Sequence, residues 1–312
     1  MIISASRRTD IPTYYSNWFF NRVMDGYVLV RNPMNAHQIS KIALNPDVVD
    51  GIVFWTKNPI PMLNELKILH DYMYYFQFTL NSYAQDVEAH VPNKQKHIIP
   101  AFKKLSDMIG PDRVIWRYDP IFLNDTYTPE YHIRYFERIA KELSPYTKKC
   151  TISFIDFYRN TSKNVSGLSL RDFPEETQKS LAKELAAIAH SYGLLIDTCA
   201  EGIELQEYGI EHARCIDDRL LSKLLECPLD IGKDKSQRLE CGCIESIDIG
   251  AYNSCRNGCK YCYANYSEKT VRSNFAKHIP DSPLLFGEGG SDDKIMERKV
   301  MSCKINQIRF DI

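Results

Sequence analysis

Three cysteines lie within eight residues of one another in the last quarter of the chain. Cys255, Cys259 and Cys262 stand in the segment CRNGCKYCYANY with the spacing C-x3-C-x2-C. Cysteine thiolates are the usual protein ligands of iron–sulfur clusters. Three closely spaced thiolates can hold a cubane cluster and leave its fourth iron without a protein ligand, so that this iron is free to bind a small molecule. The spacing therefore predicts a 4Fe–4S cluster with one open iron.

Other metal sites are compatible with the same cysteines. Zinc prefers four tetrahedral ligands from cysteine and histidine, usually supplied as paired C-x2-C units. Cys259 and Cys262 form one such pair, and Cys241 with Cys243 could complete it. A structural zinc site and a simple electron-transfer cluster therefore stay open as alternatives to a cluster with an open iron.

Four further cysteines precede the triplet and could form a second centre. Cys199 ends a predicted strand, Cys215 lies in the next predicted helix, and Cys241 and Cys243 flank a glycine. Four thiols from one region could ligate a second iron–sulfur cluster or a zinc ion. Free cysteines are also often buried as small apolar side chains. We expect the three remaining cysteines to be structural, namely Cys150, Cys227 and Cys303.

The secondary-structure elements that must position these cysteines alternate between strands and helices along the chain. Short β-branched or aromatic runs are separated by longer stretches with helical spacing, which is typical of parallel strands joined by crossover helices. Eight alternations predict an α/β fold, a (β/α)8-type or partial barrel of parallel strands. A doubly wound open sheet is the alternative, although the sequence contains no GxGxxG and no GxxxxGK(S/T) motif. We expect strands at 1–6, 27–31, 51–56, 74–80, 113–118, 150–156, 193–199 and 245–252, and helices near 16–25, 60–71, 94–109, 129–143, 174–191 and 211–226.

Charged side chains follow directly on several of these strands. In barrel enzymes the chemistry gathers at the carboxyl ends of the strands, because the loops there meet at one mouth. A guanidinium can hold a carboxylate through two parallel hydrogen bonds, and an aspartate can accept hydrogen bonds from ribose hydroxyls. Structural ion pairs around the rim are the alternative role. The candidates for cofactor or substrate binding are Arg7, Arg8, Asp10, Arg117 and Asp119.

The chain resembles a known family through several short sequence motifs. SASRRTDIP, VFWTKNP, WRYDP and YCYAN together are similar to the bacterial family DUF1848, and C-x3-C-x2-C with an aromatic before the third cysteine resembles the signature of radical SAM enzymes. The tyrosine-rich YCYANY has a more distant likeness to the spore photoproduct lyase group. The resemblance implies that Cys255, Cys259 and Cys262 bind a 4Fe–4S cluster, that S-adenosylmethionine (SAM) chelates the open iron, and that an electron donor such as flavodoxin or ferredoxin reduces the cluster.

The position of the triplet departs from the radical SAM pattern. Radical SAM enzymes usually carry it after the first strand, whereas here it follows the last predicted strand. In a closed barrel the last strand lies beside the first, so the triplet would still face the same mouth. We therefore expect a permuted radical SAM-like core, with a barrel at 1–244 and the last strand, the cluster loop and an extension at 245–312.

Composition limits the kinds of partner that the chain can have. Its 312 residues are 44% hydrophobic and 25% charged, with a formal net charge of -1, which gives no generic surface for nucleic acid. The sequence lacks an apolar run long enough for a membrane span and a signal-peptide pattern at its start. We expect a cytoplasmic protein whose ten cysteines are metal ligands or buried thiols rather than disulfides.

Together these patterns predict an enzyme. A site-differentiated 4Fe–4S cluster would reductively cleave SAM to start hydrogen abstraction from an unknown substrate, since cofactors of this kind carry the difficult chemistry and the protein positions them. The alternative is an iron–sulfur or zinc-binding redox or structural protein without SAM chemistry.

Overall fold

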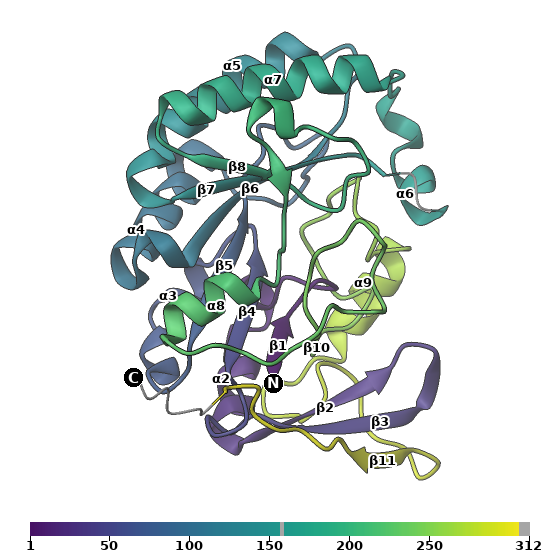
Figure 1. Cartoon of the computed structure of the whole chain (residues 1–312). Helices are drawn as coiled ribbons and strands as arrows, with labels where there is room; N and C mark the ends of the chain where they lie inside the picture. The colour runs from purple at the N-terminus through teal and green to yellow at the C-terminus, as the bar shows by residue number, and fades with distance from the viewer. Residues whose placement is uncertain (157–158, 306–312) are drawn as a thin grey trace, which may run out of the picture.

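A computed structural model describes residues 1–156 and 159–305 of the chain. Its main feature is a sheet of eight strands, all parallel to their neighbours, with helices around it (Figure 1). This confirms the α/β class and the parallel sheet. The sheet is open between its two edge strands in the order β10-β1-β4-β5-β6-β7-β8-β9, so the described residues form no closed barrel. The strands are β1 (Ile2–Ala5), β4 (Gly51–Thr56), β5 (Tyr74–Thr79), β6 (Val114–Ile121), β7 (Lys149–Phe154), β8 (Leu195–Thr198), β9 (Glu211–His212) and β10 (Ile247–Asp248).

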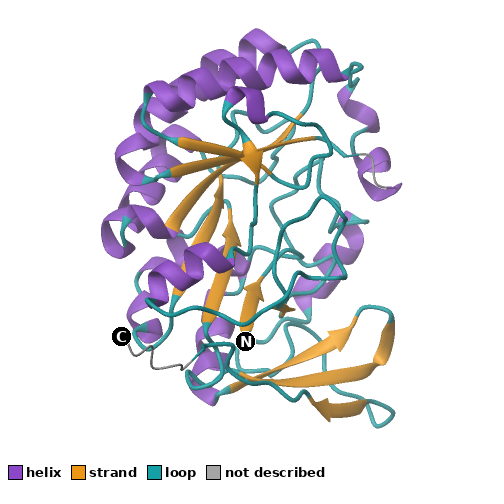
Figure 2. Cartoon of the chain, in the orientation of Figure 1, coloured by secondary structure: helices purple, strands orange, loops and turns teal. Residues whose placement is uncertain are grey.

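A second, smaller sheet was not predicted from the sequence. Residues 27–31 were expected to join the parallel sheet, but β2 (Tyr27–Asn32) pairs antiparallel with β3 (Asn35–Ala43), and β11 (Lys294–Glu297) pairs parallel with β3 on its other side. The strand predicted at 27–31 is confirmed as β2, but its assignment to the parallel sheet was wrong. A short connection allows β2 to form a hairpin, whereas a parallel partner requires a long crossover. Figure 2 shows this sheet set apart from the fan of parallel strands.

Helices cover one face of the main sheet. Figure 1 shows α4, α5 and α7 along its outer side. The main core includes Phe54, Phe76 and Trp116 from the strands and Phe102, Phe136 and Leu185 from these helices. The helices are α1 (Ile11–Tyr14), α2 (Ser16–Asp25), α3 (Ile60–Leu63), α4 (Ile99–Ile109), α5 (Pro129–Leu143), α6 (Arg159–Asn164), α7 (Glu175–Ser191), α8 (Asp218–Leu225) and α9 (Glu268–Ala276).

The other face of the sheet packs against the later part of the chain. Side chains alternate between the two faces of a strand, and Ile2, Val53 and Tyr75 belong to a second cluster with Ile216 and Leu221. This cluster also contains Cys215, Cys241 and Cys243. The inner face of the sheet therefore brings together cysteines that lie far from the strands in sequence.

The last predicted helix and the last predicted strand are shorter than expected. The helix predicted at 211–226 is α8 alone. Glu211 and His212 form the edge strand β9, which pairs with Asp197 and Thr198 of β8, and Asp217 caps α8 through the backbone N–H of Arg219. The strand predicted at 245–252 is limited to β10, which pairs with Ile3 and Ser4 of β1. Local sequence pattern does not specify how many residues of an edge strand find a partner.

Within residues 1–156 and 159–305, none of the helices combines the length and the apolar character needed to cross a membrane.

Candidate cofactor site

A single cavity of about 570 Å3 gathers the residues that the sequence singled out. We call it the cysteine cavity. It lies at the carboxyl ends of β1, β4, β6 and β7, under the segment that carries the cysteine triplet. Residues from distant parts of the chain thus line one open cavity. Among those that line it are Arg7, Arg8, Asp10, Arg117, Asp119, Cys199, Cys215, Cys241, Cys243, Cys255, Cys259 and Cys262.

The cysteine triplet lies on a loop between β10 and α9 that docks onto residues 87–90. The backbone N–H of Lys260 donates to the carbonyl of Val87 at 2.9 Å, and the N–H of His90 donates to the carbonyl of Asn257 at 3.1 Å. Gly258 has φ +66°, and a Cβ there would lie 3.0 Å from His90 Cδ2. Glycine reaches this backbone conformation without steric cost, which is why it separates the first two cysteines.

Asp10 ties this loop to the first strands. Its buried carboxylate accepts hydrogen bonds from the side chain of Thr56 at 2.8 Å, from the backbone N–H of Lys57 at 2.8 Å and from Asn257 Nδ2 at 3.0 Å. It also caps α1 through the N–H of Thr13. These four donors use both oxygens, so Asp10 holds the end of β4 and the cysteine loop in register.

A buried ion network lies beside the triplet. Glu88 is 1% exposed and pairs with the ammonium groups of Lys57, at 2.8 Å, and Lys94, while Tyr261 of the cysteine loop donates its hydroxyl to the same carboxylate. Two lysines share one carboxylate, so the network carries an excess positive charge. Lys57 Nζ also lies 5.3 Å from the centre of the Tyr261 ring.

This excess charge acts on the thiols. Burial raises the pKa of Cys259 to about 12, and the Lys57 ammonium opposes that increase. Burial raises the pKa of Cys262 as well, again opposed by Lys57. For Cys255, burial, the Asp10 carboxylate and the two other thiols all raise the pKa. The three thiols therefore lie near enough to influence one another, and a cation faces two of them. A positive ion that binds all three would stabilise their thiolate forms.

The four other predicted cysteines also meet. Cys199 Sγ lies 3.1 Å from Cys215 Sγ, and the Cys243 thiol lies close enough to Cys215 and Cys241 to shift the pKa of both. The hydrogen bond from Cys199 lowers the pKa of Cys215, but the contact with Cys243 and burial outweigh it. The net effect raises the pKa of Cys215 to about 11. All ten cysteines of the chain are free thiols. We call this set of four the thiol group.

Arg117 and Asp119 pair with each other beside the thiol group. Arg117 Nε donates to Asp119 Oδ2 at 2.9 Å, and Nη1 donates to Cys215 Sγ at 2.8 Å. Although burial opposes it, the guanidinium keeps the pKa of Asp119 below its usual value. The structural ion pair that the sequence left open thus exists, and its Arg117 guanidinium places a positive charge beside Cys215 Sγ.

Arg7 and Arg8 form a wall of the cysteine cavity. Arg7 Nη2 donates to Ser246 Oγ at 2.9 Å, and its guanidinium lies 5.8 Å from the ring centre of Trp55. Arg8 lies 5.1 Å above the ring of Tyr252. Trp55 is half-buried and lines the cavity, whereas Trp116 is fully buried in the core.

Sequence reasoning missed part of the site. Glu88 and Lys94 belong to no strand end, and their role depends on the loop 80–94 folding back over the cysteine loop. Tyr252 and Tyr263 also line the cavity, and Tyr263 donates a hydrogen bond to the Arg7 carbonyl at 2.7 Å. The tyrosine-rich composition of 261–266 was the one available signal for Tyr263.

The donor set matches the chemistry of an iron–sulfur or zinc centre. Seven thiols line the cavity, and cationic side chains face both groups. As the side chains stand, the part of the chain that the structure describes contains no group of three or more histidine, cysteine, aspartate or glutamate residues that could hold a metal ion.

Comparison with known proteins identifies the family but not the activity. A family model described as a domain of unknown function, DUF1848, matches residues 2–264. This match covers the whole parallel sheet and the cysteine triplet. The search of curated proteins gave no match. The chain therefore belongs to the DUF1848 family, as its short sequence motifs predicted.

Proposed function

We propose that this protein is a radical SAM-like enzyme with a permuted core. The observation that carries the proposal is the cysteine cavity, in which the C-x3-C-x2-C triplet, a second set of four thiols and the predicted arginines share about 570 Å3. Ligand sites are concave and combine a few convergent polar groups with apolar walls. A cavity of this size accommodates a small cofactor beside the three thiols.

In this proposal Cys255, Cys259 and Cys262 are the ligands of a 4Fe–4S cluster with one open iron. Bound there and reduced by an electron donor such as flavodoxin or ferredoxin, the cluster would pass one electron to SAM, break a carbon–sulfur bond to give methionine and a 5'-deoxyadenosyl radical, and so start hydrogen abstraction from a substrate. Lys57 places a positive charge beside two of the thiolates. That charge offsets part of the negative charge that three thiolates bring into a buried site.

The residues around the cavity have separate roles in this proposal. Arg7 and Arg8 are placed to bind the carboxylate of SAM or an anionic part of the substrate, since a guanidinium offers paired donors. Asp10 fixes the cysteine loop through Asn257. Arg117 and Asp119 lie at the thiol group, where a second iron–sulfur cluster or a zinc ion would bind through Cys199, Cys215, Cys241 and Cys243.

The test is anaerobic reconstitution with iron and sulfide, followed by addition of dithionite and SAM. We expect an iron–sulfide chromophore and release of 5'-deoxyadenosine. Cys259→Ala should lose the triplet cluster and SAM cleavage, whereas Cys303→Ala, a cysteine outside the cavity, should retain both. Normal iron, sulfide and 5'-deoxyadenosine in the Cys259→Ala variant would disprove the ligand assignment.

A second candidate function is a redox or structural metal protein that never reacts with SAM. The observation that favours it is the thiol group, because four cysteines are the donor set of structural zinc and of electron-transfer clusters. Metal analysis of anaerobically purified protein separates the two. Zinc without iron, or a chromophore that neither binds nor cleaves SAM, favours this second function.

A further inference from the structure

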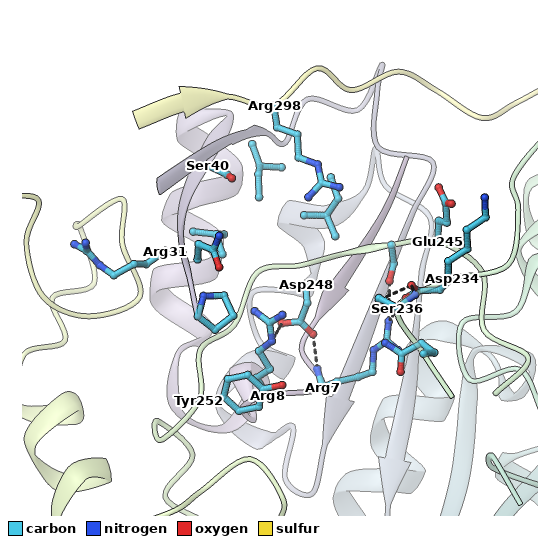
Figure 3. A pocket seen from close by; sticks show the side chains of 18 of the residues that line it. Arg7, Arg8, Arg31, Ser40, Asp234, Ser236, Glu245, Asp248, Tyr252 and Arg298 are labelled. Carbon is cyan, nitrogen blue, oxygen red and sulfur yellow. Dashed lines mark hydrogen bonds and ion pairs between the residues drawn. The ribbon is translucent and has the colours of Figure 1, made fainter. Parts of the chain in front are cut away.

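A second cavity, of about 600 Å3, lies on the other side of Arg7 and Arg8. We call it the arginine cavity. Its walls come from β2 and β3 of the small sheet, from residues 234–237 and from the segment 245–248, which includes β10. Figure 3 shows Arg298 extending from the end of β11 toward its interior, opposite Arg8 and Asp248. The basic residues that line it are Arg7, Arg8, Arg31, Lys235 and Arg298.

The buried carboxylates of this cavity are already satisfied. Asp248 accepts hydrogen bonds from the hydroxyls of Ser4 and Ser6 and from the backbone N–H groups of Arg7 and Gly250, at 2.6 to 3.0 Å. These four hydrogen bonds occupy the acceptor positions of the Asp248 carboxylate and leave little room for further N–H donors.

Asp234 is used in a similar way. It accepts from the backbone N–H and the hydroxyl of Ser236, and it lies 3.5 Å from Arg7 Nη2. Of the three acidic side chains that line the cavity, this leaves only Glu245, which is exposed.

The basic side chains are not satisfied to the same degree. Arg31 is paired with Asp293 at 2.9 Å. Arg8, however, lies over the Tyr252 ring and has one long ion-pair contact of 3.9 Å, from Nε to Asp248. Among the described residues, the structure contains no hydrogen bond or ion pair for the Lys235 ammonium or the Arg298 guanidinium. Arg8, Lys235 and Arg298, from three separate segments, thus have N–H donors available for a ligand in the arginine cavity.

We propose that the arginine cavity binds a phosphoryl group of the substrate. A phosphoryl group has three oxygens that point in different directions, so it can meet Arg8, Lys235 and Arg298 from separate segments. A carboxylate has two oxygens in one plane and suits a single guanidinium instead. The two cavities share Arg7, Arg8, Ser236, Gln237, Tyr252 and Tyr263.

This shared wall determines how a substrate would lie across the two cavities. A substrate anchored by its phosphoryl group in the arginine cavity would extend past Tyr252 and Tyr263 toward the cysteine cavity. As a statement about the substrate, the inference rests on the proposed function. Arg298 lies beyond the residues that match the family model, so part of the anchor comes from outside the matched region.

The experiment is calorimetric titration of the full-length, anaerobically purified protein with inorganic pyrophosphate at low salt. We expect Arg298→Gln to weaken binding about tenfold, which corresponds to about 1.4 kcal/mol. Lys299→Gln is the matched control, because Lys299 is the next residue, is also exposed and does not line the cavity. Succinate, titrated in the same way, should bind more weakly than pyrophosphate.

Three results would overturn the inference: absence of pyrophosphate binding, an equal loss in Arg298→Gln and Lys299→Gln, or succinate binding as tight as that of pyrophosphate. The titration does not depend on turnover. Protein that cleaves SAM without binding pyrophosphate refutes the phosphoryl site alone. Protein that binds pyrophosphate through Arg298 without cleaving SAM refutes the proposed function and leaves the anion site in place.

Discussion

The buried network around Glu88 gives the sharpest prediction about stability. Glu88 is 1% exposed, and its partners Lys57 and Lys94 are 12% and 20% exposed. Glu88→Gln keeps the size of the side chain and one carbonyl oxygen but removes the charge. Two largely buried ammonium groups would then lack a counterion, next to the loop that carries the cysteine triplet.

Two estimates of the magnitude agree. Removing one partner of a buried ion pair usually costs about 3–5 kcal/mol, because the remaining charge is left buried and unpaired. Burial would raise the pKa of Glu88, but Lys57 and Lys94 outweigh it and lower the pKa from 4.5 to about 2. Each pH unit of difference corresponds to about 1.4 kcal/mol, so this lowering represents about 3 kcal/mol of folding free energy.

The sign of the pH dependence follows from the lowered pKa. The stabilisation by Glu88 is complete above the unfolded-state pKa of 4.5 and is lost as pH falls from 4.5 through about 2. The difference in free energy of unfolding between wild type and Glu88→Gln should therefore be about 3–5 kcal/mol at pH 7 and about 1 kcal/mol smaller at pH 3.5.

Urea unfolding followed by tryptophan fluorescence measures both differences. Glu142→Gln is the control, since Glu142 forms an ion pair with Lys103 and is 51% exposed. A surface pair of this kind contributes about 0–1 kcal/mol. Equal effects of Glu88→Gln and Glu142→Gln, or a difference that does not shrink in acid, would refute the reasoning.

Three further predictions concern the site and its surroundings. Cys243→Ser, which breaks the thiol group, should lower the metal content of the protein without removing the triplet cluster. Cys227→Ser should leave the metal content unchanged, and analysis of iron, zinc and sulfide measures both effects. Burial and the neighbouring Asp156 raise the pKa of Glu201 from 4.5 to about 7. Because the unfolded chain loses this proton at lower pH than the folded protein does, the folded state loses stability as pH rises from 4.5 to 7. Glu201→Gln should therefore be more stable than wild type by about 1–3 kcal/mol at pH 8 and equal to it at pH 4. Gly258→Ala should cost about 1–2 kcal/mol, because φ is +66°, and lower iron loading, while Gly167→Ala, which meets no atom within 4 Å, changes neither stability nor loading.

Most of the parallel sheet could be predicted from local pattern. Buried parallel strands read as continuous apolar runs, and GIVFWT and YYFQFT form β4 and β5 as expected. The segment YVLVR carries the same signal, yet β2 belongs to the small sheet. Its partner β3 is rich in polar residues and shows no clear strand pattern, so nothing local distinguishes a hairpin from a strand of the main sheet.

The site was predictable where chemistry is encoded in residue type and spacing. The cysteines and the charged residues at strand ends were identified because thiol spacing and strand position are local properties. Glu88, Lys94 and Arg298 were not, because their role depends on loops and on a small sheet that meet the site only after folding. Their neighbours in sequence carry no pattern that marks them.

The sequence by itself determined the parallel α/β fold, the family, and the thiols and charges available for chemistry, since these follow from local periodicity and from the spacing of reactive side chains. Only the tertiary structure decided that seven of the ten cysteines line one cavity, that two lysines share one buried carboxylate beside them, and that a second, basic cavity adjoins it. These features depend on contacts between segments far apart in sequence, such as Asp10 with Asn257. Contacts of that range are set by how all the elements pack together, and no short stretch of sequence specifies them.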